Sequence, residues 1–574
     1  MSAKQEDIRL SAAARGWRLG FVFVLLVLVG GGIVTKLVSL YTLDQDFLQR
    51  QGDARSLRTT LIPAHRGIVS DRNGEPLAVS APVATIWADP ARSDSFHPSL
   101  EYLATLLDMP RADLAEKLRV AKQANKRFIY LKRQVTPELA DQIGDLKVPG
   151  VHVDREYKRY YPAGEVATHV VGFTGIDGNG QEGLELAFDD WLRGEPGRKL
   201  VMQDRVGRTI KHIKSIESEK PGKDVQLSLD LRIQYMAYRE LKAAVTSHKA
   251  DSGSAVILDS RTGEVLAMVN QPAYNPNDRS EVDGNGLRNR AVTDTFEPGS
   301  TMKPLTVAAA MMSGQYQADS IVDTSPGFMR IKGRTIRDHR NYGELDLTGI
   351  ITKSSNIGVS KLALSMEPES VRNLLHNIGL GQVTETGFPG ERTGRLPFYP
   401  AKRVVERATM SYGYGLSVTP LQLAQAYIPL ANGGVALPAT LLKQYEMPAG
   451  RRVMPEYIAD SVLEMMETVT RPGGTGRRAA VHGYRSAGKT GTVHKVLSTG
   501  YADDKYISFF AGIVPVSDPR LVVVVMVDNP KGQEYYGGEV AAPVFSRVSA
   551  NALRILNVAP DKWPESKQQQ VAGN

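Results

Sequence analysis

The first strong hydrophobic pattern in the chain is an uncharged, mostly apolar run over residues 19–35, between Arg18 and Lys36. At about 1.5 Å per residue this run is slightly short of a bilayer core, and residues 37–40 extend it. We therefore predict a membrane-spanning helix over residues 19–40. The alternative is a cleaved signal peptide, but a small-residue cleavage site should then follow, and the residues after Lys36 are bulky.

Positive charges precede this run, and they predict its orientation. Lys4, Arg9, Arg15 and Arg18 all lie on the N-terminal side. The positive-inside rule then places residues 1–18 in the cytoplasm and everything after about residue 41 outside it.

Residues 41–225 alternate short extended stretches with turn signals, without a catalytic cluster. Residues 66–74 read as a strand that ends in an Asn-Gly turn, and residues 98–122 and 137–145 have helical character. We interpret this region as an elongated, mainly β pedestal.

From residue 226 to about 558 the pattern is that of one large core. Apolar strands over 254–258 and 265–269 flank a hairpin turn, residues 305–312 form an apolar, alanine-rich helix, and strands over 506–514 and 521–527 close the region. Strands at both ends with helices between them predict an α+β domain, an antiparallel sheet covered by helices. Residues 559–574 form a polar tail.

Composition and charge exclude several classes of site. The chain has no cysteine, which removes disulfides, thiolate nucleophiles and cysteine-based zinc sites. The net charge of +8 comes from 70 Lys and Arg against 62 Asp and Glu, spread along the chain without a basic block. We therefore expect no nucleic-acid partner, and we predict neither a metal nor a cofactor.

Three short motifs carry the candidate chemistry. In Ser300-Thr301-Met302-Lys303 a hydroxyl and an amine lie three residues apart, so on a helix they share one face. This pattern alone is weak, because Ser486-Ala487-Gly488-Lys489 matches it too. The second motif is Ser354-Ser355-Asn356, and the third is Lys489-Thr490-Gly491-Thr492, which suits a sheet edge.

Together and in this order, the three motifs resemble the signature of penicillin-binding proteins and class A β-lactamases. Wider blocks resemble class B penicillin-binding proteins, from the anchor to about residue 550, and most closely the septal D,D-transpeptidase. These blocks are residues 296–304 and 487–492, Arg66-Gly67 with Asp71-Arg72-Asn73-Gly74, Glu182-Gly183-Leu184-Glu185, and Tyr412-Gly413-Tyr414-Gly415 before Val418-Thr419-Pro420. The elongation-specific transpeptidase is the close alternative.

The resemblance implies a role for each motif residue. Ser300 would attack the D-Ala–D-Ala carbonyl of a peptidoglycan stem peptide, with Lys303 as proton acceptor and Ser354 as a proton relay to the leaving amine. The substrate-binding residues would be Asn356, Lys489, Thr490, Gly491 and Thr492. The resemblance further implies inhibition by β-lactams. Four tyrosines could form an aromatic wall, although core or loop packing is an equal alternative: Tyr501, Tyr506, Tyr535 and Tyr536.

The same resemblance implies a place and partners. The protein would be a single-pass protein of the bacterial inner membrane with its transpeptidase domain in the periplasm. A membrane glycan polymerase and other division proteins would bind through the anchor and the pedestal.

Other functional classes fit the sequence less well. A class A β-lactamase needs a water-activating glutamate, typically in a Glu-x-x-Leu-Asn loop, and the nearest string, 369–373, lacks the leucine. A β-lactam sensor should have several spans and a cytoplasmic effector. A catalytically silent scaffold should have lost Ser300, Lys303, Ser354 or Lys489, and all four are present.

Overall fold

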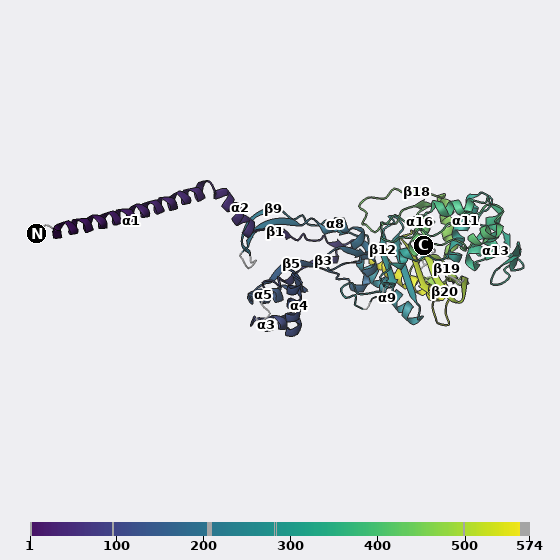
Figure 1. The fold of residues 1–574 in the computed structure, drawn as a ribbon. Coiled ribbons are helices and arrows are strands. Elements are labelled where there is room, and N and C mark those ends of the chain that lie inside the picture. The colour runs from purple at the N-terminus through teal and green to yellow at the C-terminus, as the bar shows by residue number, and fades with distance from the viewer. Residues whose placement is uncertain are drawn as a thin grey trace, which may run out of the picture. The chain divides into compact units, whose positions relative to one another are not determined.

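The computed structural model describes residues 3–93, 97–203, 209–280, 282, 284–497 and 500–562 (Figure 1). The chain divides into two compact units. Unit 1 contains residues 1–64, 82–156 and 195–220, and unit 2 contains residues 65–81, 157–194 and 221–574. The chain therefore passes between the units several times.

Unit 1 begins with a long apolar helix, α1 (Ala3–Thr42), followed by α2 (Gln45–Ser56). Within α1, Gly16–Thr42 is long and apolar enough to cross a membrane, with a mean hydropathy of 2.5 and no burial against the rest of the protein. Its 27 residues correspond to about 40 Å of helix. The predicted apolar helix is confirmed, and it is longer at both ends than residues 19–40.

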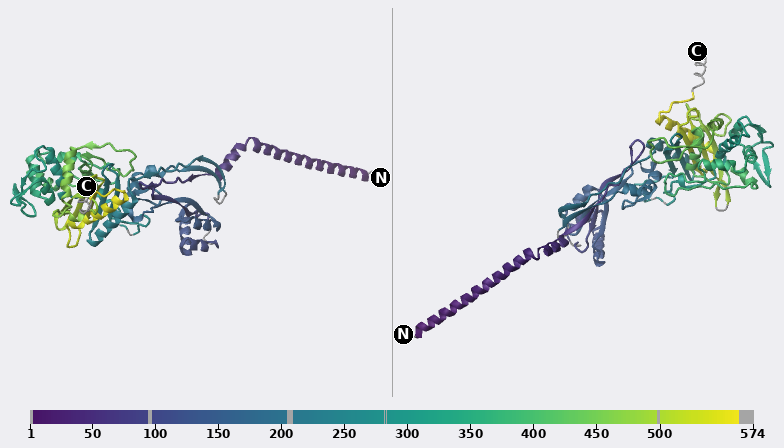
Figure 2. Two further views of the ribbon diagram at one scale, coloured as in Figure 1. Left: turned by 180° about the vertical axis from the view of Figure 1, so that it is seen from behind. Right: turned by 90° about the horizontal axis from the view of Figure 1, so that it is seen from above.

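The rest of unit 1 combines a small sheet with a helical cluster (Figure 2). An antiparallel sheet has the order β1-β8-β9, with β1 Leu57–Ile62, β8 Gly197–Gln203 and β9 Thr209–Glu217. The helices α3 (Leu100–Leu106), α4 (Arg111–Gln123) and α5 (Pro137–Asp145) surround a separate apolar core with β4 (Ile129–Val135). The helical stretch predicted over residues 98–122 is thus two helices, because Pro110 cannot continue a helix through its interior.

The core of unit 2 is a five-stranded antiparallel sheet with the order β12-β11-β21-β20-β19. Its strands are β11 (Ser252–Asp259), β12 (Val265–Gln271), β19 (Ala487–Leu497), β20 (Gly500–Val514) and β21 (Leu521–Asp528). The strands expected from the apolar runs are present, and the predicted antiparallel sheet is confirmed. Every residue of β11 and β12 is buried, which explains why their central parts, residues 255–258 and 265–269, are continuously apolar.

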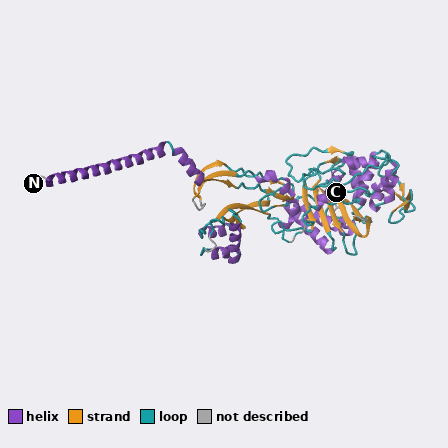
Figure 3. Cartoon of the chain, in the orientation of Figure 1, coloured by secondary structure: helices purple, strands orange, loops and turns teal. Residues whose placement is uncertain are grey.

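Helices cover both faces of this sheet (Figure 3). The helices α9 (Leu231–Ser247) and α19 (Ala542–Ile555) pack with one face, whose core includes Ile257, Val523 and Phe510. The opposite face, with Val256, Val524 and Phe509, belongs to the larger core that contains α11 (Lys303–Met312) and α16 (Pro420–Ala431). The strand β19 lies at the edge of the sheet, so one of its sides is open for a ligand.

The remaining elements range from two to 13 residues in length. The helices are α6 Thr168–Val171, α7 Gly183–Ala187, α8 Asp189–Arg193, α10 Arg290–Thr293, α12 Leu347–Lys353, α13 Asn356–Ser365, α14 Ser370–Asn377, α15 Val404–Met410, α17 Glu456–Glu467 and α18 Gly537–Val540. The 3-10 helices are η1 Gly164–Val166, η2 Gly299–Met302 and η3 Arg477–Ala479. The strands are β2 Val69–Ser70, β3 Pro76–Ala88, β5 Val151–Tyr160, β6 Phe173–Thr174, β7 Gly180–Glu182, β10 Val225–Gln226, β13 Val322–Asp323, β14 Phe328–Ile331, β15 Arg334–Arg337, β16 Glu344–Leu345, β17 Val435–Ala436 and β18 Arg451–Arg452.

A buried ion cluster ties the early motif residues to unit 2. Glu185, fully buried, accepts hydrogen bonds from Arg66 Nε at 2.7 Å and from Arg159 Nε at 2.6 Å. Nearby, the Asp71 carboxylate accepts from the backbone N–H of Leu231 at 3.0 Å, at the start of α9. Residues 65–81 and 157–194 therefore pack with the large sheet, and the compact units do not divide at residue 225. The functional boundaries 41–225 and 226–558 stay a prediction.

Candidate active site

The first motif lies at the junction of two helices. Ser300 belongs to η2 and is half-buried, whereas Lys303 opens α11 and is fully buried. Pro304 falls in the first turn of α11, where its missing N–H costs no helical hydrogen bond. The 3-10 turn before α11 presents the Ser300 hydroxyl at the end of the helix instead of within it.

Ser354 connects the three motifs. Its hydroxyl lies 3.2 Å from Ser300 Oγ, 3.0 Å from Lys303 Nζ and 3.0 Å from Lys489 Nζ. The residue ends α12 in the left-handed conformation, with φ of 60°. Non-glycine residues rarely adopt this conformation unless the surroundings hold them there. Residues of the first and third motifs thus converge on one strained serine of the second motif.

The Lys303 amine is directed at Ser354 and not directly at Ser300. It donates to the Ser354 carbonyl at 2.5 Å and to its hydroxyl at 3.0 Å. Among the hydrogen bonds of the described residues, none joins Lys303 Nζ to Ser300 Oγ. Ser354 Oγ therefore connects the Ser300 hydroxyl to the Lys303 amine, and a proton can pass between them through it once the hydroxyl hydrogens reorient.

Burial lowers the pKa of both amines. The pKa of Lys303 lies well below its usual value, mainly because burial destabilises the cation, and because the charge of Lys489 repels it; Asp338 opposes this shift. Burial lowers the pKa of Lys489 to about 7. For both lysines, a lowered pKa favours the neutral amine, which is the form that can accept a proton.

The edge strand β19 places the third motif beside this cluster. The hydroxyl of Thr490 shares a hydrogen bond of 2.9 Å with that of Thr475, and the Thr492 hydroxyl accepts from Gly537 N–H at 2.9 Å. Between them, Gly491 packs so closely on the Phe509 ring that a Cβ would lie 1.9 Å from it. Only glycine fits this position, which explains the motif's central residue.

The remaining predicted residue, Asn356, turns to a different partner. Its side-chain amide donates to the carbonyl of Arg337 at 2.9 Å, and its backbone N–H donates to Asp338 at 2.6 Å. Among the described contacts it makes no hydrogen bond to Ser300, Lys303 or Lys489. Asn356 therefore lies at the start of α13, next to the cluster and outside its hydrogen-bond network.

A cavity of about 640 Å³ opens over these groups. Ser300, Ser354, Thr490 and Thr492 line it, together with tyrosines and histidines. Tyr506 stacks on Tyr535 and Tyr535 on Tyr536, with ring centroids 4.3 and 4.5 Å apart. Three of the four tyrosines named from the sequence thus line this cavity, whereas Tyr501 hydrogen-bonds to Glu297 at 2.9 Å.

Two family models match the chain. Residues 253–550 match the penicillin-binding protein transpeptidase domain, and residues 61–227 match the penicillin-binding protein dimerisation domain. The first match covers the sheet, the serine and lysine cluster and the aromatic cavity. The chain belongs to the penicillin-binding protein transpeptidase family.

Curated members of this family align with nearly the whole chain. Peptidoglycan D,D-transpeptidase FtsI of Escherichia coli K12 is 44% identical over 550 residues, which cover 95% of this chain and 93% of the relative. The probable peptidoglycan D,D-transpeptidase PenA of Neisseria meningitidis serogroup A is 42% identical and covers 98% and 96%.

Solved structures of penicillin-binding proteins have the same fold. The transpeptidase domain of Burkholderia pseudomallei penicillin-binding protein 3 is 44% identical, with a TM-score of 0.54, and covers 59% of this chain and 98% of that one. Penicillin-binding protein 3 of Mycobacterium tuberculosis, solved in complex with aztreonam, is 29% identical with a TM-score of 0.68 and covers 88% and 98%.

Sequence reasoning missed two carboxylates that organise this family's site here. Asp338 accepts from the Ser355 hydroxyl at 2.5 Å and from the N–H groups of Asn356 and Ile357, so it caps α13. Glu297 accepts from Gly415 N–H at 2.8 Å and from Tyr501. Glu297 belongs to the block 296–304, which the sequence already indicates. Asp338 belongs to none of the sequence motifs, so no local pattern predicts its role.

Replacing Lys303 with methionine tests the burial of the amine. Because the pKa of Lys303 is lower in the folded protein than in the unfolded chain, its burial costs stability at low pH, and this cost falls as the pH rises toward about 10.4. We expect the thermal stability of the wild-type protein, relative to Lys303→Met, to increase between pH 7 and pH 10. The midpoint of thermal unfolding at each pH measures this difference.

The matched control is Lys402→Met, which removes an exposed amine of the same unit. A stability difference between wild type and Lys303→Met that stays constant with pH would contradict the lowered pKa.

Proposed function

We propose that this protein is a serine-type peptidoglycan D,D-transpeptidase that cross-links stem peptides at the division septum. The observation that carries the chemistry is the convergence of Ser300, Lys303 and Lys489 on the Ser354 hydroxyl. The septal role is supported by 44% identity to FtsI over 95% of the chain. The intact cluster favours an active enzyme over a silent scaffold.

In the acylation step, Ser300 Oγ attacks the carbonyl carbon of the D-Ala–D-Ala peptide bond. The serine proton moves toward the neutral Lys303 amine, with Ser354 Oγ as the relay between them. The carbon–nitrogen bond then breaks, the terminal D-Ala leaves as an amine that receives this proton through Ser354, and the remaining peptide stays bound to Ser300 as an ester. The backbone N–H groups of Ser300 and Thr492 would hold the oxyanion.

In the transfer step, an amine of a neighbouring stem peptide attacks the ester carbonyl. The attacking amine loses a proton to Lys303, and its nitrogen forms the new peptide bond. The ester bond to Ser300 then breaks, and Ser300 Oγ takes up the proton to recover its hydroxyl. The cross-link replaces the broken peptide bond, so the reaction needs no external energy source and neither a metal nor a cofactor enters these steps.

The edge strand is suited to hold the donor peptide. The ammonium form of Lys489 and the hydroxyls of Thr490 and Thr492 would bind the terminal carboxylate, and the backbone at Gly491 would pair with the extended peptide. Asn356 would contact the donor peptide only after its amide leaves the Arg337 carbonyl.

The same proposal places the protein in the inner membrane. Residues 1–18 would lie in the cytoplasm, residues 19–40 in the bilayer, and the region 41–225 would dock division proteins, a glycan polymerase among them. The transpeptidase domain, residues 226–558, and the polar tail, 559–574, would then lie in the periplasm. Support comes from the apolar helix and from the basic residues that precede it.

Protease accessibility tests this topology. Protease added to spheroplasts should digest the chain after about residue 41, because that part is exposed on the outer face of the membrane. A fluorescent tag on the N-terminus should remain protected in the same sample. Protection of the C-terminal part until the spheroplasts are lysed would overturn the proposed orientation.

Intact-protein mass spectrometry after treatment with penicillin tests the serine mechanism. We expect one adduct, mapped to Ser300, that persists on the order of tens of minutes if deacylation has a barrier of about 22 kcal/mol. The Lys303→Ala variant should acylate roughly 10²–10⁴-fold more slowly, because it lacks the proton acceptor.

The second serine–lysine motif provides a matched control for the chemistry. The Ser486 hydroxyl is buried against Thr470 and the Ala479 carbonyl, away from the cavity over Ser300. Ser486→Ala should therefore acylate at the wild-type rate. An adduct on a serine other than Ser300, or its loss within seconds with release of hydrolysed drug, would contradict the transpeptidase mechanism.

Depletion in living cells tests the septal role. Loss of a septal cross-linking enzyme should block division while growth in length continues, so depleted cells should form filaments. Complementation with the wild-type gene should restore division, and the Ser300→Ala variant should not. Round cells upon depletion would instead assign the protein to elongation.

A further inference from the structure

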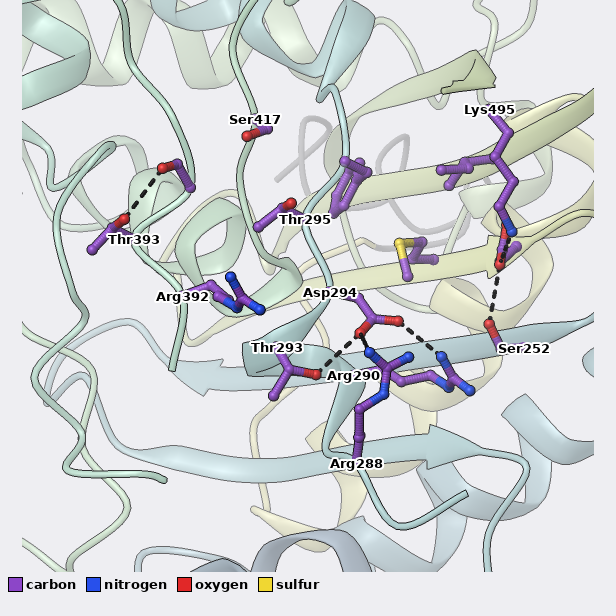
Figure 4. A pocket seen from close by; sticks show the side chains of 15 residues that line it. Ser252, Arg288, Arg290, Thr293, Asp294, Thr295, Arg392, Thr393, Ser417 and Lys495 are labelled. Atoms are coloured by element: carbon purple, nitrogen blue, oxygen red, sulfur yellow. Dashed lines mark hydrogen bonds and ion pairs between the residues drawn. The ribbon is translucent and has the colours of Figure 1, made fainter. Parts of the chain in front are cut away.

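A second cavity of unit 2, of about 570 Å³, lies away from the serine cluster (Figure 4). Its wall is formed by the ends of sheet strands, represented by Ser252, Lys495 and Asp528, and by the segments that carry Arg290 and Arg392. None of its lining residues lines the cavity over Ser300. The volume is within the range of small-ligand sites.

The charge of this cavity is positive. Four cationic side chains line it, Arg288, Arg290, Arg392 and Lys495, against two carboxylates, Asp294 and Asp528. We call the part around Arg288, Arg290, Asp294 and Arg392 the arginine pocket. Because the cationic side chains outnumber the carboxylates, the lining keeps a net positive charge and attracts anions.

The pairing leaves one guanidinium available. Asp528 accepts from Lys495 at 2.6 Å. Asp294 accepts from Arg290 at 2.9 Å and lies 3.4 Å from Arg288. Among the described residues, no side chain or carbonyl group forms a hydrogen bond or ion pair with the Arg392 guanidinium.

The neighbouring arginines are held in position. Figure 4 shows the guanidinium groups of Arg288 and Arg290 beside the Asp294 carboxylate, with Arg392 extending into the same space from another segment. Because Asp294 already fixes the first two groups, an incoming anion needs to order only Arg392. A guanidinium binds a carboxylate through two parallel N–H···O bonds, which makes a carboxylate a well-matched ligand.

The arginine pocket is connected to the catalytic cavity along β19. A third cavity, of about 410 Å³, shares lining residues with both of the others. Thr295, Phe296 and Lys495 also line the cavity that contains the arginine pocket, and His494 also lines the cavity over Ser300. In addition, the segment that starts at Arg290 reaches Ser300 ten residues later. A long polymer bound at Ser300 can therefore follow β19 toward the arginine pocket.

We propose that the arginine pocket is a non-catalytic subsite for a carboxylate of a peptidoglycan peptide, with Arg392 as its principal ligand. This inference rests on the proposed function for the identity of the polymer. The hydroxyls of Thr295 and Ser417, which also line the cavity, suit the amide and hydroxyl groups of such a polymer.

Equilibrium binding to the full-length protein in detergent tests the proposal. The protein is first acylated with penicillin, and mass spectrometry verifies the adduct, so the catalytic cavity is occupied. The probe is a soluble muropeptide that lacks the terminal D-Ala–D-Ala. We expect it to bind, and Arg392→Gln to weaken binding by at least about tenfold through loss of a charge-assisted pair.

The matched control is Arg334→Gln, which removes an exposed arginine of β15 that does not line this cavity and should leave binding unchanged. Equal weakening by both variants would overturn the proposal, because it would show a general effect of charge. Binding of inorganic pyrophosphate, but not of the muropeptide, in an Arg392-dependent manner would also overturn it and would assign the pocket to phosphates.

Failure of the two proposals can be told apart. If penicillin forms no adduct, the serine mechanism is wrong, and the same titration is then made with Ser300→Ala. Loss of muropeptide binding in Arg392→Gln with a normal adduct supports the subsite. Wild-type muropeptide affinity in Arg392→Gln contradicts the subsite and leaves the serine mechanism intact.

Discussion

The site depends on the burial of two amines against one serine hydroxyl. A cation removed from water is costly, so burial lowers the pKa of both Lys303 and Lys489, and repulsion by Lys489 lowers that of Lys303 further. A lysine in water is almost always protonated near neutral pH and cannot accept a proton. Burial thus converts an ordinary side chain into a base, and the fold must supply the stability that this burial costs.

Rigid elements on each side of Ser354 hold the two amines and the hydroxyl in place. The edge strand β19 presents Lys489 from the sheet, α11 presents Lys303 from the helical layer, and the end of α12 holds Ser354 itself. Close backbone contacts fix these elements: a Cβ at Gly491 would overlap the Phe509 ring, and a Cβ at Gly413 would lie 2.1 Å from the Gly299 carbonyl oxygen. Small residues at these points allow the approach that the hydrogen-bond distances require.

Much of this arrangement could be predicted from the sequence, for identifiable reasons. Four strands of the sheet contain buried apolar runs that predict them, and the order of the three motifs indicates the family without any distance. The bridging position of Ser354 and the cap provided by Asp338 could not be predicted, because both depend on contacts between segments far apart in the chain. The division of the helical stretch before α4 follows from a local signal, because Pro110 is tolerated at the start of a helix and not in its interior.

The early motif residues show why motif and domain need not coincide. Arg66, Arg159 and Glu185 come from the region interpreted as a pedestal, yet their ion cluster is buried in the unit that contains the large sheet. Loss of the Glu185 carboxylate would leave the buried Arg159 guanidinium without its ion-pair partner, which is costly away from water. Asp71 acts in the same unit by holding the start of α9, which packs on the sheet. The physical function of these residues is therefore to hold parts of the predicted pedestal within the unit of the large sheet, and Asp71 does so at the start of the helix that packs on β11 and β12.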